Sequence, residues 1–240
     1  AAAARAAAQP ELRLGNRTRD ALELVLRAKM LTQVLKACAT LEMSTRLSPP
    51  CAVAFAQGGA ARVMLKLVTQ CNRSTPHQEV LRSVLTTLTQ VAALGPALAR
   101  DMVAVEQSAA ASVAHLEGGP TGCAEVVVDL VHNFRDKEAI FPLAVQLLAR
   151  LALASPEFKE AVLGSPELSK RLRETVAALD RKLAHAAGTR PLGAANSAGG
   201  SRPAKPSAKP SAKPTAKGGA MAASQLAEAT LTLKEFIHGN

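Results

Sequence analysis

Aromatic residues are scarce in this chain: it contains no Trp and no Tyr, and only 5 of its 240 residues are Phe. Strands favour aromatic and β-branched side chains, so this scarcity disfavours β structure and aromatic ligand pockets. It also removes the stacking platforms that single-stranded nucleic-acid binders need. The apolar residues that are present, 48% of the chain, are mostly Ala, Leu and Val, and they predict closely packed helices.

Two further signatures are missing. The 4 cysteines, Cys38, Cys51, Cys71 and Cys123, show neither the CxxC spacing nor the Cys/His clustering of a zinc site, so we interpret them as buried thiols in a reducing compartment. No uncharged apolar run reaches the roughly 18 residues of a membrane span, so we expect no membrane insertion. The alanine-rich start without Met suggests a fragment of a longer protein.

The net charge is +10, which favours acidic partners such as nucleic acid, anionic lipid or an acidic protein surface. Part of this charge lies in a Lys-Pro repeat, RPAKPSAKPSAKPTAKGG, that has no acidic and no large apolar side chain. Such a segment favours an extended, polyproline-like conformation. It is either a tether to a polyanion or a solvated spacer, and its candidate polyanion-binding residues are Arg202, Lys205, Lys209, Lys213 and Lys217.

From about Asn16 to Ala187, apolar residues recur at helical spacing between short Gly, Pro and Ser breaks. The clearest stripe is Ala60, Val63, Met64, Leu67, Val68 and Cys71. Thr75 before Pro76, with Gln78 three residues on, predicts a capped helix start. Similar starts are expected at Ser155 and Ser165, and further helices over 123–134 and 137–153.

These patterns predict an all-α fold, an armadillo/HEAT-like α-solenoid of about four degenerate repeats followed by a disordered basic tail. A globular helical bundle is the alternative. We expect a disordered Ala-rich segment at 1–15, an armadillo-like domain at 16–187 and a disordered Gly/Ser and Lys-Pro linker at 188–220. Residues 221–240 should form a short helix that either docks or frays.

No catalytic constellation is recognisable in the sequence. The glycine-rich stretch 118–122 lacks the lysine and the preceding strand of a phosphate loop, so we interpret it as a turn. The histidines are scattered, with no pair at metal-binding spacing: His77, His115, His132, His185 and His238. We therefore predict no catalytic residue, no metal and no cofactor, and a binding protein rather than an enzyme.

Three blocks carry a family resemblance: LEMSTRLSPPCAVAFAQGGA from Leu41, KLVTQCNRSTPHQEVL from Lys66 and VVDLVHNFRDKEAIF from Val127. Together they resemble the C-terminal armadillo-like region of the abnormal spindle family, over roughly residues 18–163. The resemblance implies an α-solenoid that follows calponin-homology domains and calmodulin-binding IQ repeats in the complete protein. Neither is present here, so calmodulin binding is not expected of this chain.

The resemblance also implies a function, namely a non-catalytic scaffold that organises spindle poles and focuses microtubule minus ends. The partner would be a protein of the spindle pole or minus end, with acidic tubulin tails as an additional partner of the Lys-Pro segment. The expected location is the cytoplasmic cytoskeleton and spindle pole or centrosome, or the nucleus in interphase. The alternative function is nucleic-acid or chromatin association through the Lys-Pro segment.

Within the helical region, polar residues at two turns and on one helix are candidates for partner binding. At each of them, turn closure or simple solvation is the competing interpretation. The candidate residues are Asn72, Arg73, Arg82, Arg135 and Lys137.

Overall fold

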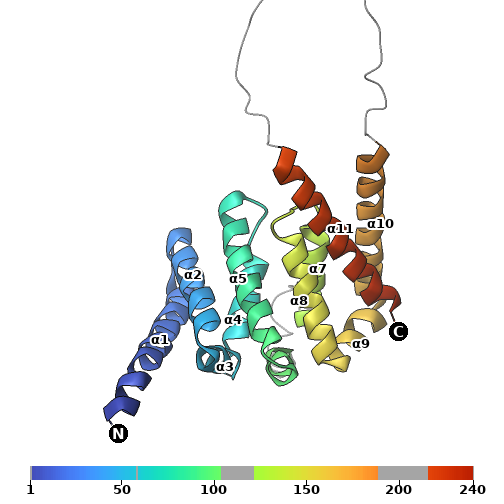
Figure 1. Ribbon diagram of the computed structural model, residues 1–240. Helices are drawn as coiled ribbons and strands as arrows, with labels where there is room; N and C mark the ends of the chain where they lie inside the picture. The colour runs from blue at the N-terminus through green and yellow to red at the C-terminus, as the bar shows by residue number, and fades with distance from the viewer. Residues whose placement is uncertain (1, 58, 104–121, 189–215, 240) are drawn as a thin grey trace, which may run out of the picture.

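The computed structural model describes residues 2–57, 59–103, 122–188 and 216–239. Every regular element in these ranges is a helix, and no strand occurs among them. The all-α prediction is therefore confirmed for the described part of the chain (Figure 1). The helices are α1 (Ala2–Arg27), α2 (Leu31–Leu47), α3 (Pro49–Gln57), α4 (Ala60–Gln70), α5 (Thr75–Ala93), α7 (Cys123–Asn133), α8 (Phe141–Ala154), α9 (Pro156–Gly164), α10 (Pro166–Gly188) and α11 (Ala216–His238). Residues 96–103 are also helical.

The helices form two rows. In the first row α2 packs against α5, α5 against α8, and α8 against α11. These four helices stand side by side and run in the same direction from top to bottom in Figure 1. Behind them α3 contacts α4, α4 contacts α7, and α7 contacts α10, while α1 covers α2 at one end. Large side chains of both rows are fully buried, among them Leu41, Leu85, Leu148 and Leu172.

Local sequence explains several helix starts. Ser155 caps α9, since its Oγ accepts the Phe158 N–H at 3.2 Å and donates to Glu157 at 2.8 Å. The backbone N–H of Glu157 and the Ser155 hydroxyl lower the pKa of that carboxyl, as expected for an acid at a helix N-terminus. Gly59 precedes α4 with a φ of 71°, a left-handed conformation that glycine adopts without steric cost.

Two predicted helix starts are wrong by a few residues. The N-cap of α5 is Ser74 rather than Thr75, and Pro76 lies in the first turn. Helix α8 begins at Phe141 rather than Lys137, because residues 138–140 form a turn and Pro142 occupies the first helical turn. Proline is well suited to that position, since the N–H that it lacks would have no partner within the helix.

The chain ends also differ from the expectation. Helix α1 begins at Ala2, although we expected disorder up to residue 15; alanine has the highest helix propensity, so the run can extend the amphipathic segment that follows. At the other end α11 begins at Ala216, five residues before the expected start, within the range predicted as linker. Residues 189–215, which include most of the Lys-Pro repeat, lie outside the described residues.

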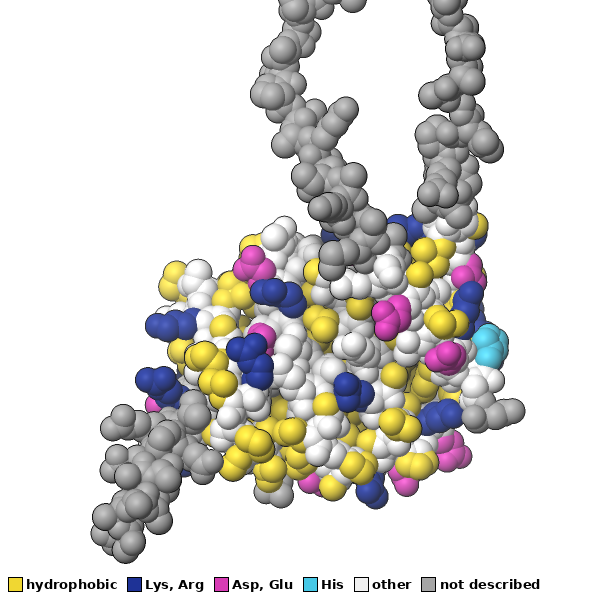
Figure 2. Space-filling model, viewed as in Figure 1, with side chains coloured by type: hydrophobic (Ala, Val, Ile, Leu, Met, Phe, Trp, Pro, Cys, Tyr) yellow, Lys and Arg dark blue, Asp and Glu magenta, His cyan; other side chains and the backbone are white. Residues whose placement is uncertain are grey.

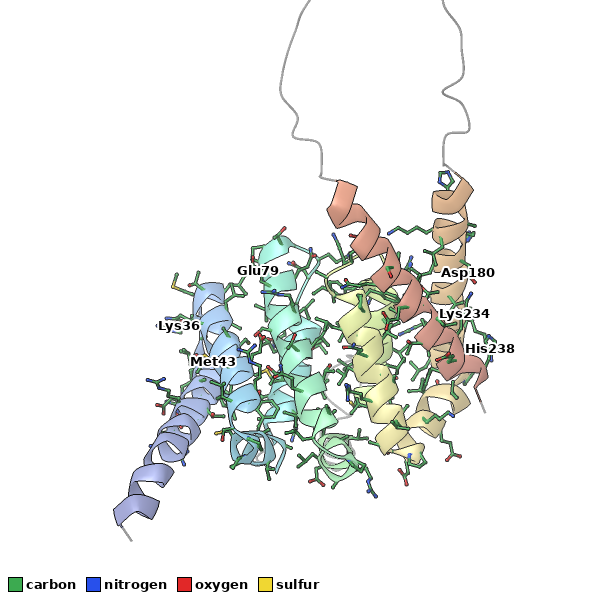
Figure 3. The ribbon with its side chains drawn as sticks, in the orientation of Figure 1. Lys36, Met43, Glu79, Asp180, Lys234 and His238 are labelled. Carbon is green, nitrogen blue, oxygen red and sulfur yellow. The ribbon has the colours of Figure 1, made fainter. Side chains whose placement is uncertain are left out.

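Helix α11 packs on the row instead of fraying. Its contacts are with α8 and α10, and they bury Leu226, Ala229, Leu233 and Phe236. Lys234 forms an ion pair with Asp180 of α10 at 2.7 Å, and both residues are labelled in Figure 3. The C-terminal helix is thus the last member of the first row.

Polar side chains also connect the helices. Ser83 of α5 donates to Glu42 of α2 at 2.7 Å, and His132 Nδ1 of α7 lies 3.0 Å from Thr175 Oγ1 of α10. Among the described residues no single helix is long and apolar enough to cross a membrane. One bent pair within this described part of the chain, Pro49–Ala56 and Ala60–Gln70, which meet at 74°, satisfies that length and composition together.

Candidate interaction surface

The first two candidates, Asn72 and Arg73, lie in the connection between α4 and α5, and their polar groups mainly close this turn. Asn72 Oδ1 accepts the Ser74 N–H at 2.9 Å, and the Asn72 N–H donates to His77 Nδ1 at 2.8 Å. Gln78 reaches back to the carbonyl of Arg73 at 2.6 Å. The polar groups of Asn72 are therefore used within the α4–α5 connection, which supports the turn interpretation for this residue.

The structure brings two of the candidate turns together. Arg73 before α5 forms an ion pair with Asp136 in the α7–α8 connection, and both side chains are about half exposed. Arg135 in that second connection donates through Nη1 to the carbonyl of His132 at 2.7 Å, and Lys137 is half-buried. The two connections therefore form one mixed-charge edge at the N-terminal ends of α5 and α8.

The remaining candidate of the helical region lies on the outer face of the first row. Arg82 is exposed on α5, three residues after the exposed Glu79, so the two share one helix face. In the view of Figure 3, Lys36 and Met43 lie on the neighbouring α2 and Lys234 on α11. Lys and Arg side chains are scattered over this face among apolar and uncharged ones (Figure 2).

The candidate tail residues cannot be placed in the same way. Arg202, Lys205, Lys209 and Lys213 lie outside the described residues, and Lys217 is described only by its backbone within α11. Their predicted binding of a polyanion stays a prediction.

A groove that the sequence patterns did not predict lies between α1 and α2. It has a volume of about 350 Å³ and is lined by Arg17, Asp20, Ala21, Leu24, Lys36, Ala37, Thr40, Met43 and Ser44. Four of these lining residues are apolar, and three are charged, namely Arg17, Lys36 and Asp20. Sequence periodicity shows which side chains of each helix face inward, but it does not show that two helices diverge enough to leave a groove.

The thiols of Cys38 and Cys71 are poorly suited to act as nucleophiles. Burial raises the pKa of the Cys38 thiol to about 12, with smaller effects from Cys71 and Glu42, and burial raises that of Cys71 to about 11. Both groups are therefore protonated and weakly nucleophilic at neutral pH. No group of three or more His, Cys, Asp or Glu side chains that could hold a metal ion occurs in the described part of the chain.

Comparison with known proteins gives one consistent result. No protein-family model matches the chain, and no solved structure matches it. The abnormal spindle-like microcephaly-associated protein homolog of Felis catus is 35% identical over 127 residues, which is 53% of this chain and 3% of that protein. The human protein is 42% identical over 81 residues and the Bos taurus homolog 43% over 82 residues, each covering 34% of this chain and 2% of the relative.

The chain thus spans about 3% or less of the length of these curated relatives. The similarity nevertheless extends over a third to a half of its own residues. The chain is therefore similar to the abnormal spindle-like microcephaly-associated proteins, which confirms the resemblance that its three sequence blocks predict.

Proposed function

We propose that this chain is a non-catalytic, protein-binding module of a spindle-associated protein, built as an armadillo-like α-solenoid. The observation that carries the proposal is its similarity to proteins named for an abnormal spindle, at 35% identity over 127 residues. Two rows of stacked helices support it, because such stacks present long, continuous surfaces to partner proteins. The partner would be a protein of the spindle pole or of microtubule minus ends.

The outer face of the first row is the part of the module best placed to bind. It combines exposed charges from separate helices, Arg82 of α5 and Lys36 of α2, and Lys36 also lines the groove between α1 and α2. Arg82 and Lys137 are the candidates to test first, because the side chains of Asn72, Arg73 and Arg135 are engaged in hydrogen bonds or ion pairs within the chain.

The test is localisation of the whole chain, fused to a fluorescent protein, in dividing cells. We expect accumulation at spindle poles, and a loss of accumulation in the Arg82→Glu, Lys137→Glu variant. The control makes the same change of charge on α10, at the exposed Lys170 and Arg173. A uniform distribution of the folded chain throughout mitosis would contradict the proposal.

Co-sedimentation with microtubules then separates direct from indirect attachment. The role of the Lys-Pro segment is best tested by replacing Arg202, Lys205, Lys209, Lys213 and Lys217 with Gln. Truncation is unsuitable, because removal of α11 would uncover the surfaces of α8 and α10 on which Leu233 and Phe236 pack. Loss of microtubule binding in the Gln variant would assign a tethering role to this segment. Salt-sensitive DNA retention lost in the same variant would support chromatin association instead.

A further inference from the structure

Three helices of the first row end in an exposed leucine. Leu47 is the last residue of α2, Leu94 is the C-cap of α5, and Leu153 lies at the penultimate position of α8. Their exposed fractions are 61%, 49% and 89%. Because the three helices run in the same direction, these ends lie along one edge of the molecule, opposite the edge that carries Arg73 and Asp136. Hydrophobic side chains gather along this lower edge in Figure 2.

The same short sequence pattern occurs at each of these ends. A leucine is followed by Ser, Gly or Ala-Ser and then by an exposed proline that begins the next helical segment. The three occurrences are Leu47-Ser48-Pro49, Leu94-Gly95-Pro96 and Leu153-Ala154-Ser155-Pro156. Leucine and proline together make this edge apolar over three successive units of the stack.

In a fourth occurrence of the pattern, the leucine packs against its own chain. Leu163, which precedes Gly164, Ser165 and Pro166, is partly buried against the core. A leucine at a helix C-terminus usually makes such a contact with its own chain. Leu47, Leu94 and Leu153 do not gain comparable burial, so packing within the chain does not explain them. Their recurrence along one edge distinguishes them from singly scattered surface leucines, which need no explanation.

The spacing of the leucines favours an α-helix as the segment that binds to this edge. Packed helices lie about 8–10 Å apart, so leucines on successive row helices repeat at about that interval. Seven residues of an α-helix span about 10.5 Å. A helix that crosses the ends of α2, α5 and α8 can therefore offer an apolar side chain to each leucine from positions one heptad apart.

Exposed arginines beside the leucines favour a binding partner that carries acidic side chains. Arg46 precedes Leu47, Arg150 lies one helical turn before Leu153, and Arg100 follows Leu94; all three are exposed. Glu157, in the first turn of α9, also lies at this edge, and the pKa of its carboxyl is lowered most by its own backbone N–H, then by Ser155 and to a smaller extent by Arg100. The half-buried Asp101 also lies beside Arg100 in the sequence. Arg46 and Arg150 therefore leave the edge basic at both ends, which disfavours a second copy presenting the same arginines.

We propose that the edge formed by Leu47, Leu94 and Leu153 is a docking site for an amphipathic helix of a partner protein, with apolar residues at heptad spacing and acidic residues beside them. The proposal concerns a surface separate from the outer face discussed above, and it does not depend on a role at the spindle. The leucines provide apolar contacts and the arginines provide ionic contacts. The partner helix therefore need not form backbone hydrogen bonds with this edge.

The test uses the whole chain and a designed helical peptide of about 21 residues, three heptads, with leucines repeating every seven positions and glutamates beside them. Binding is measured by fluorescence anisotropy, and the binding site by leucine methyl NMR. We expect binding with shifts centred on Leu47, Leu94 and Leu153. Affinity should fall at least about tenfold for Leu153→Ser and for Arg150→Glu, the loss expected when a residue that contributes strongly to binding is replaced. The matched control is Leu231→Ser, since Leu231 is also exposed, at 58%, but lies on α11.

Several results would overturn the proposal. One is failure of the acidic peptide to bind; another is equal binding of a peptide in which lysine replaces every glutamate. Equal loss of affinity in the Leu231→Ser control would show nonspecific adhesion to exposed leucine. Concentration-dependent self-association that Leu153→Ser abolishes would assign the edge to a second copy of the chain instead. None of these results bears on spindle localisation, so the two proposals fail independently.

Discussion

Leu233 is the most deeply buried of the described side chains of α11, and its replacement gives the most direct mutational test of the fold. Leu233 is 0% exposed between α8 and α10, whereas Leu231, two residues away on the same helix, is 58% exposed. Replacing a fully buried leucine with alanine costs about 2–5 kcal/mol through lost burial and the cavity that remains. Replacing an exposed leucine changes stability by no more than about 0.5 kcal/mol.

The cost should appear first as local opening of α11, because this helix is the last of the row and contacts only its neighbours at that end. At about 1.4 kcal/mol for each factor of ten, Leu233→Ala should increase the open fraction at least about thirtyfold. Hydrogen exchange of α11 peptides measures this fraction. Exchange in α2 should not change.

The control variant is Leu231→Ala, which has the same chemistry on the opposite face of α11. We expect wild-type exchange throughout this variant. Equal protection of α11 in the two variants would refute the reasoning, since it would mean that Leu233 is not buried between α8 and α10. Faster exchange spread equally over α2 and α11 would instead show that the row unfolds as a single unit.

Three further predictions concern single sites. Burial raises the folded-state pKa of Cys38 from 9.0 to about 12, so its contribution to stability is complete below pH 9 and is lost as the pH rises toward 12. Chemical unfolding from pH 8 to 11 should show a shallower loss of stability in Cys38→Ala than in the wild type; parallel curves would contradict this. The exposed Arg73–Asp136 ion pair should give a coupling energy of about 0.2–1 kcal/mol in a double-mutant cycle, and a value near 3 kcal/mol would mean that the pair is buried. Gly59→Ala should destabilise the chain by about 1–2 kcal/mol because of its φ of 71°, whereas Gly95→Ala, which also has open space around it, should be neutral or stabilising in thermal unfolding.

Local sequence was sufficient for the features that depend on neighbouring residues. The apolar stripe from Ala60 predicted a helix that the structure places at Ala60–Gln70, and Ser155 caps α9 as expected. Where two adjacent residues could both cap a helix, as at Ser74 and Thr75, the pattern did not distinguish them.

Contacts between distant segments could not be predicted in this way. The ion pair between Arg73 and Asp136 joins residues of two separate connections, and periodicity within either one contains no information about the other. The position of α11 is similar: its apolar stripe predicted a helix, but only the packed structure shows that α8 and α10 receive it. The row helices begin at Leu31, Thr75, Phe141 and Ala216, and this unequal spacing explains why sequence periodicity alone did not reveal the row.

The exposed leucines were not among the candidate residues predicted from the sequence. Leu153 lies three residues after Arg150 and seven after Gln146, so it shares the exposed face of α8 rather than its buried stripe. The recurring Leu and Pro at the ends of α2, α5 and α8 was a usable signal, but it was interpreted only as a set of helix boundaries. Exposure, which needs the folded structure, separates these leucines from the partly buried Leu163.

The order of helices in the first row is tested most directly by nuclear Overhauser effects between Ile, Leu and Val methyl groups. An open stack predicts cross-peaks that join α2 with α5, α5 with α8 and α8 with α11, and none that join α2 with α11. Methyl cross-peaks between α2 and α11 would show a closed bundle, and they would contradict the extended surface on which both proposed interactions depend.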